Sequence, residues 1–193
     1  MNAFLKLYHT WWKNIDKKIL FIILLLFSLS LFFSLTSTSL IASEKLNTKD
    51  YYFFFKHLIF VSVGLIIIFI FSSLEKFYLI KISKILFILS LILLFMVPII
   101  GIEVKGSKRW LDFLFLPRFQ PVEILKPFFI IMIVSILASE YSKNIYFKYA
   151  LSFTLVLIII FLLISQPDIG QSLLIFLTWL SIIFVSGINL YIF

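Results

Sequence analysis

Residues 19–41 are ILFIILLLFSLSLFFSLTSTSLI, and this stretch carries no charged side chain. It is longer than the roughly 20 apolar residues that cross a bilayer as one helix. A secretory signal peptide has a shorter apolar region, so we interpret the stretch as an uncleaved transmembrane helix, with cleavage after Ala42–Ser43 as the alternative. Five more apolar runs follow, at 51–73, 79–101, 122–139, 146–165 and 171–193. The sequence therefore predicts an all-α fold, a polytopic membrane helix bundle of about six transmembrane helices.

Composition excludes several classes of protein. Hydrophobic residues make up 63% of the chain and charged residues only 13%, about half the charged fraction of a soluble domain. The net charge of +8 does not indicate nucleic-acid binding, because Lys and Arg of membrane proteins gather in cytoplasmic loops. The absence of cysteine excludes disulfides and thiolate metal sites.

Charge distribution predicts the orientation. Residues 1–18 form a basic and aromatic arm, and residues 19–193 form the membrane domain. The loops near 75–84 and 140–148 are net positive, which places them and the N-terminus in the cytoplasm. Alternation then puts the polar segment 102–120 outside as the largest outer loop. His57, near the start of the second run, is expected to be an interfacial or packed residue rather than a ligand.

The outer loop concentrates cations where positive charge is disfavoured. Lys105, Lys108 and Arg109 bracket the dipeptide Gly106–Ser107, whose backbone amides can turn toward an anion. Two ammonium groups and a guanidinium suit a phosphate or pyrophosphate. The alternative is that these residues only bind anionic lipid headgroups.

The fourth apolar run carries polar residues at helical spacing. Gln120, Glu123 and Lys126 recur every three residues and so share one helix face, which is expected to line a cavity. Pro127 cannot donate to the carbonyl of Glu123 and should bend the helix. The alternative is a Glu123–Lys126 ion pair that only stabilises the helix end.

Two further prolines mark helix ends. Pro98 should kink or terminate the third helix. Pro167 is expected at the first position of the sixth helix, and Asp168 in its first turn complements the helix dipole. Asp168 could also face the basic loop as an ion-pair partner, a cation ligand or a proton acceptor.

These motifs together resemble a known family. Residues 105–111 (KGSKRWL), 119–126 (FQPVEILK) and 166–172 (QPDIGQS) resemble the two signatures of the SEDS family, membrane glycosyltransferases that polymerise peptidoglycan from lipid II. Lys126–Pro127, Gln171 and the arm around Trp11–Trp12 are more similar to its cell-division branch, FtsW, than to its elongation branch, RodA. Val122 departs from the family pattern, which has a small or small polar residue there.

The resemblance implies a glycosyltransferase of the bacterial inner membrane that extends glycan strands during septal synthesis and releases undecaprenyl pyrophosphate. By position, Lys105, Lys108 and Arg109 would contact the pyrophosphate or the cavity rim, and Gln120, Glu123, Lys126 and Asp168 would line the central cavity. The implied partners are lipid II, a class B penicillin-binding protein with transpeptidase activity, and other division proteins. No metal ligands are implied, and a divalent cation is left open.

The family has about ten spans, so the resemblance covers its N-terminal half. Its general base lies after a seventh span, and we assign no catalytic residue among these 193. The expectation is a fragment inactive on its own. The alternatives are a division scaffold that binds a transpeptidase without catalysis, and a lipid II flippase.

Overall fold

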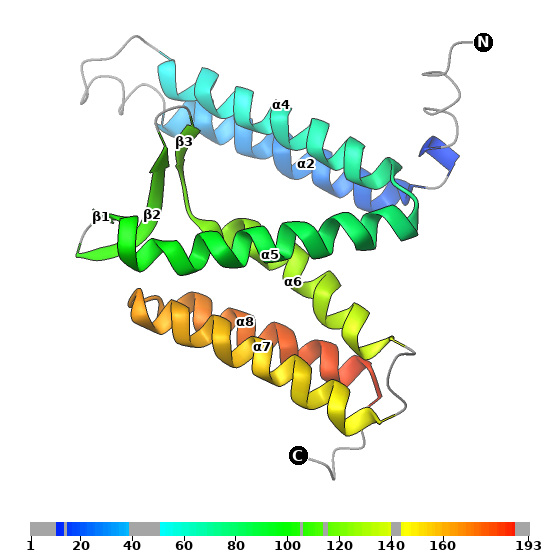
Figure 1. Cartoon of the computed structure of the whole chain (residues 1–193). Coiled ribbons are helices and arrows are strands. Elements are labelled where there is room, and N and C mark those ends of the chain that lie inside the picture. The colour runs from blue at the N-terminus through cyan, green and yellow to red at the C-terminus, as the bar shows by residue number, and fades with distance from the viewer. Residues whose placement is uncertain are drawn as a thin grey trace. The chain divides into compact units, whose positions relative to one another are not determined.

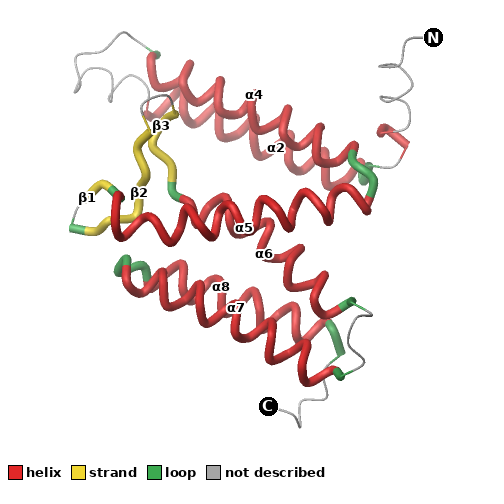
Figure 2. The backbone as a smooth tube through the Cα atoms, viewed as in Figure 1, coloured by secondary structure: helices red, strands yellow, loops and turns green. Residues whose placement is uncertain are grey.

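The computed structural model describes residues 11–13, 15–38, 51–104, 106–113, 116–139 and 144–187 (Figures 1 and 2). These residues belong to two compact units, 1–75 and 76–193, and each unit is considered by itself. The N-terminal arm to residue 10 and the segments 39–50 and 140–143 lie outside the described residues. The predicted division into an arm and a membrane domain therefore stays a prediction.

The first unit contains two apolar helices. Helix α2 (Lys17–Phe33) begins after Asp16, whose carboxylate accepts hydrogen bonds from the next turn's amides, and it continues into the π-helix η1 (Ser34–Thr38). Helix α4 (Tyr52–Ser73) packs against both. Ser30 Oγ lies 2.8 Å from His57 Nε2, so His57 is a packed residue, as the sequence predicts. Most other apolar side chains of α2 and α4 are exposed, which suits a lipid environment.

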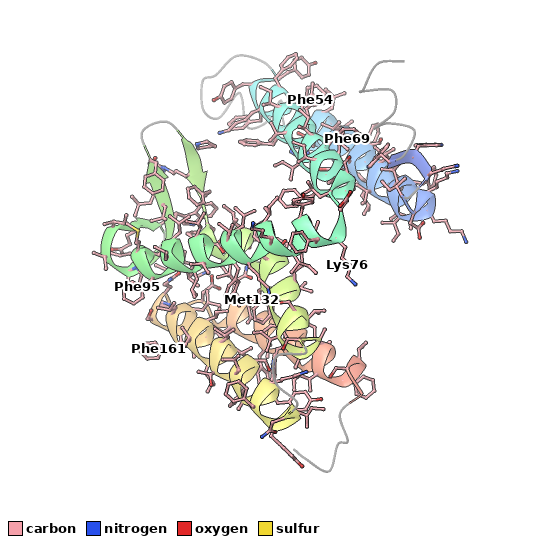
Figure 3. All side chains as sticks on the ribbon, turned by 45° about the vertical axis from the view of Figure 1, so that its right-hand side comes forward. Phe54, Phe69, Lys76, Phe95, Met132 and Phe161 are labelled. Atoms are coloured by element: carbon pink, nitrogen blue, oxygen red, sulfur yellow. The ribbon has the colours of Figure 1, made fainter. Side chains whose placement is uncertain are left out.

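In the described part of the second unit, four helices surround a hydrophobic core, and Figure 1 shows their arrangement. They are α5 (Lys76–Ile100), α6 (Pro121–Leu137), α7 (Ile145–Ser165) and α8 (Ile169–Val185). Inside the core, Trp179 of α8 donates its indole N–H to Ser152 Oγ of α7 at 3.1 Å. Phe95 and Phe161, labelled in Figure 3, are 61% and 73% exposed. The unit thus has a packed interior and an apolar exterior.

A small antiparallel sheet replaces the irregular loop expected at 102–120. Its strands are β1 (Ile102–Val104), β2 (Ser107–Phe113) and β3 (Leu116–Phe119), in the order β1-β2-β3 (Figure 2). Gly106 joins β1 to β2 with a φ of +80°, a conformation that glycine adopts without steric cost. The dipeptide Gly106–Ser107 therefore forms the turn of a hairpin, and its predicted contact with an anion stays a prediction.

Within the residues that the structure describes, a helix occupies each of the six predicted runs, and the polytopic membrane fold is confirmed. Four of them, 17–36, 52–73, 76–100 and 145–165, are long and apolar enough to cross a membrane. Helices α6 and α8 have 17 residues each, fewer than the roughly 20 that span the hydrocarbon core. Two expected boundaries were wrong. Helix α5 begins at Lys76, so Lys81 and Lys84 lie in a helix, and α8 does not continue past Val185.

The end of α8 has a local cause. Gly187 follows the helix with a φ of +79°, and its amide donates to the carbonyl of Phe184 at 3.2 Å. A glycine in the left-handed region at this position commonly terminates helices by satisfying the last carbonyls. Residues 188–193 lie outside the described residues.

Candidate functional site

Strand β2 divides the basic residues of the outer segment between its two faces. Side chains alternate along a strand, and here Ser107, Arg109 and Leu111 are less exposed than Lys108 and Trp110. Leu111 is buried at 1% exposure, so Arg109 shares the face that packs on the helices. Lys108 lies on the opposite face. Lys105 lies outside the described residues.

Arg109 fastens β2 to the turn between α7 and α8. Its Nε donates to the carbonyl of Gln166 at 3.3 Å, and its Nη2 donates to the carbonyl of Pro167. Its Nη1 lies 3.7 Å from Asp168 Oδ1 in an ion pair. A planar guanidinium carries five donors on three nitrogens and can reach these three acceptors with a different nitrogen each, whereas a lysine would have to reach all three from a single nitrogen.

Asp168 combines two of the roles that its position allows. It is the N-cap of α8, where its Oδ1 accepts the amide of Gln171 at 3.4 Å. Its Oδ2 accepts a hydrogen bond from Gln120 Nε2 at 3.1 Å. The residue is only 6% exposed, and the Arg109 guanidinium balances its charge. The expectation that Pro167 starts the helix was wrong, because the helix begins at Ile169 after the Asp168 cap.

A second polar cluster lies beside the first, on α6 and α8. Lys126 Nζ is 2.6 Å from Glu123 Oε2 and 3.4 Å from Gln171 Oε1. Gln171 Nε2 donates to Glu123 Oε1 at 3.0 Å, which closes a three-residue ring. The predicted pair between Glu123 and Lys126 is formed, and it extends to the neighbouring helix. The Glu123 and Lys126 side chains keep 51% and 26% exposure, so both remain accessible.

Together these contacts form one polar site at the start of α6 and α8. Gln120 is the N-cap of α6 and Asp168 that of α8, so the two helix starts and β2 bring the predicted residues together. Arg109, Gln120, Glu123, Lys126 and Asp168 belong to this polar site, whereas Lys108 does not. The described residues contain no group of three His, Cys, Asp or Glu side chains placed to hold a metal ion.

Two glutamines in the site, Gln166 and Gln171, were quoted from the sequence as part of the family motif but were not predicted to be site residues. Gln171 follows Asp168 by three residues, so helical spacing could have placed it facing α6. Gln166 is 2% exposed, and its Nε2 donates to the carbonyl of Leu94 at 3.1 Å. That carbonyl is left without its helical donor because Pro98, four residues later, has no amide hydrogen. The signal available in the sequence was Pro98 inside a predicted helix, because it leaves one carbonyl in need of another donor.

Comparisons with known proteins identify what this arrangement is similar to. Residues 17–193 match the model of a family described as cell cycle protein, which covers FtsW, RodA and SpoVE. A relative named probable peptidoglycan glycosyltransferase FtsW, from Wigglesworthia glossinidia brevipalpis, is 32% identical over 90% of this chain and 46% of its own length. The relative of that name from Haemophilus influenzae is 30% identical over 87% of this chain and 42% of its own. The chain thus spans less than half the length of these relatives.

Solved structures show the same fold at lower sequence identity. The rod shape determining protein RodA from Thermus thermophilus superposes with a TM-score of 0.73 at 23% identity, covering 92% of this chain and 56% of RodA. A structure titled for the coordination of polymerization and crosslinking by a peptidoglycan synthase complex gives a TM-score of 0.69, covering 89% of this chain and 48% of the other. Both similarities concern the fold.

Proposed function

Because the chain belongs to the FtsW, RodA and SpoVE family of cell cycle proteins, we propose that it supplies the polar site of a peptidoglycan glycosyltransferase acting in septal cell-wall synthesis. The protein is a multi-pass protein of the bacterial inner membrane. The proposed substrate is lipid II, and the proposed acceptor is a growing glycan strand. The names of the FtsW relatives support the activity and favour the division role over elongation.

The observation that carries the proposal is the ring of Glu123, Lys126 and Gln171 beside the Arg109–Asp168 pair. In the proposed reaction, an acceptor hydroxyl oxygen bonds to the anomeric carbon of lipid II. The bond from that carbon to the pyrophosphate oxygen breaks, and the electron pair leaves with the pyrophosphate. The hydroxyl proton passes to a general base, which we do not assign among these residues. Cationic groups placed where this negative charge develops lower the barrier.

Lys126 is the group best placed to stabilise the leaving pyrophosphate. Its ammonium has three hydrogens, and its contacts with Glu123 and Gln171 account for two of them. The third can donate to a phosphate oxygen while the ring keeps the ammonium in position. Glu123 and Gln171 are positioning residues in this proposal, and Gln120 orients Asp168.

Lys105 and Lys108 are proposed to contact the pyrophosphate from the rim of the site. A divalent cation, where the reaction uses one, would take most of its ligands from phosphate oxygens and water. We assign no general base to these residues. The N-terminus is proposed to be cytoplasmic, which puts the β-sheet and the polar site on the outer face of the membrane.

The proposed protein partner is a class B penicillin-binding protein, a transpeptidase that crosslinks the new strand, together with other division proteins. The structural neighbour whose title joins polymerization to crosslinking in one complex supports this pairing. No observation favours a scaffold or a flippase over the polymerase.

The test uses a chimera in which residues 1–193 replace the matching half of a full-length FtsW relative. The chimera should convert labelled lipid II to glycan polymer, and Lys126→Met should lower that rate about 100-fold, in the range of one lost electrostatic group. Lys84→Met is the matched control and should leave the rate unchanged, because Lys84 is an exposed residue of α5 and does not belong to the polar site.

Two results would contradict the proposal. One is full polymerisation by the Lys126→Met chimera. The other is a chimera that binds its transpeptidase partner and lipid II normally but never forms polymer, which would favour the scaffold. The chain of 193 residues alone is expected to form no polymer from labelled lipid II.

A further inference from the structure

A small cavity lies at the β1–β2 hairpin, next to the turn between α7 and α8 that Arg109 contacts. Its volume is about 270 Å³, and Glu103, Ser107, Lys108, Ser165 and Gln166 contribute to its lining. Arg109, Glu123, Lys126 and Asp168 do not line it. Drug-sized ligands occupy pockets of roughly 300–1,000 Å³, so this cavity suits a smaller polar group. It adjoins the polar site described above, because Gln166 and Pro167, whose carbonyls accept from Arg109, also line it.

Gln166 brings a buried acceptor to the cavity. Its Nε2 is occupied by the carbonyl of Leu94, which fixes the orientation of the amide, because a carbonyl can only accept. Its Oε1 has no hydrogen-bond donor among the residues that the structure describes, and it is not a fully enclosed atom. Gln166 is only 2% exposed and lines the cavity, so its unused acceptor belongs to a buried residue at the cavity wall.

Glu103 and Lys108 bring one charge of each sign to the same cavity. They are direct partners across the β1–β2 ladder, so their side chains leave the same face of the hairpin about 5 Å apart. Both are exposed, and neither forms an ion pair within the described ranges. A ligand with a single charge would be attracted by one of them and repelled by the other. The pair favours a ligand that carries both charges.

The position of the cavity indicates where such a ligand comes from. Pro98, which also lines it, lies two residues before the end of α5, and Ser165 is the last residue of α7. Both helices are long and apolar enough to cross a membrane, so their ends lie at the level of the lipid headgroups. Trp110 follows Lys108 by two residues on β2 and is partly exposed. Tryptophan is enriched at the level of the headgroups.

We propose that this cavity binds the headgroup of a zwitterionic phospholipid with a primary ammonium, as in phosphatidylethanolamine. The phosphate lies at Lys108, and the ammonium donates to both Glu103 and the free Oε1 of Gln166. A primary ammonium has the hydrogens for both contacts, whereas the quaternary ammonium of phosphatidylcholine has none. The lipid then holds the hairpin at the membrane surface, next to the turn that carries Asp168.

The experiment measures lipid retention by the purified 193-residue chain. The delipidated chain is placed in nanodiscs of phosphatidylethanolamine, phosphatidylcholine or phosphatidylglycerol with the same acyl chains, and the lipid that remains after transfer to neutral detergent is counted by native mass spectrometry. Phosphatidylethanolamine should be retained about tenfold better than phosphatidylcholine, the ratio expected for losing charge-assisted hydrogen bonds.

Variants at the exposed charges test the assignment without disturbing the core. Glu103→Gln and Lys108→Met should each reduce retention of phosphatidylethanolamine about tenfold, toward the phosphatidylcholine level. Lys84→Met is the matched control and should change nothing. Far-UV circular dichroism and thermal melting verify that each variant keeps its fold.

Three outcomes would overturn the proposal. Equal retention of phosphatidylcholine would show that the ammonium hydrogens are not recognised. Preference for phosphatidylglycerol would indicate a simple basic patch. Displacement of the lipid by millimolar glycylglycine, a soluble zwitterion, would show that the cavity takes a peptide rather than a lipid. None of these results depends on glycosyltransferase activity.

Discussion

The ion pair between Arg109 of β2 and Asp168, the N-cap of α8, should stabilise the fold more than the shorter ion pair between Arg118 and Asp112 within the sheet. At 3.7 Å, two unit charges attract by about 4 kcal/mol when the effective dielectric constant is near 20. The Arg109 side chain is 33% exposed and that of Asp168 only 8%, so solvent screening and desolvation reduce this to a net coupling of about 1–2 kcal/mol. A double-mutant cycle with Arg109→Met and Asp168→Asn measures that coupling, and Asn retains the helix cap.

The control pair is Arg118 with Asp112, whose Nε and Oδ2 are 2.8 Å apart. Its side chains are 65% and 38% exposed, so a matching cycle should give no more than about 0.5 kcal/mol. Both cycles use reversible unfolding of the chain in mixtures of dodecylmaltoside and SDS, followed by circular dichroism. A coupling for Arg109–Asp168 no larger than that of the control pair would refute the reasoning that burial outweighs distance here.

Three other substitutions test individual contacts by the same unfolding assay. Gln166→Leu should cost about 1–3 kcal/mol, because it leaves the buried Leu94 carbonyl without a donor, and Pro98→Ala in the same chain should recover most of this by restoring the helical amide; no recovery would show that the carbonyl is not the cause. Ser83→Ala should be neutral or stabilise by up to about 1 kcal/mol, since the buried Ser83 Oγ lacks a hydrogen-bond partner among the described residues; a clear loss would reveal a missed partner. Gly101→Ala should destabilise by about 1–3 kcal/mol, because its Cβ would overlap the carbonyl oxygen of Val97; wild-type stability would show that the helix end adjusts freely.

Run lengths and helical spacing predicted most of the fold and part of the site. Apolar runs of membrane length predicted the helices, and the three-residue spacing of Gln120, Glu123 and Lys126 predicted their common face. The strands of the outer segment were missed. Strand β2, SKRWLDF, alternates exposed and less exposed positions without alternating in hydrophobicity, so pattern alone gives no period of two.

The missed strand also changes how the basic residues of the outer segment are arranged. As a loop, the segment could point Lys105, Lys108 and Arg109 at one anion. As a strand, it must send Lys108 and Arg109 to opposite faces. Contacts between residues far apart in the sequence, such as Arg109 with the α7–α8 turn or Gln166 with Leu94, depend on tertiary packing that local patterns do not encode.

The polar site follows from where the helices stop. The turn between α7 and α8 presents carbonyls that have no helical amide to accept from, together with the first free amides of α8. Arg109 donates to the carbonyls of Gln166 and Pro167, where the α7 dipole favours a cation, and Asp168 caps α8, where the dipole favours an anion. The end of α7 and the start of α8 therefore both stabilise the Arg109–Asp168 pair. The contacts of this pair hold β2 against the helices. The positive charges that a ligand can reach are then those of Lys126 on α6 and Lys108 on the hairpin. The residues that hold the site together are therefore different from the residues that can bind a ligand.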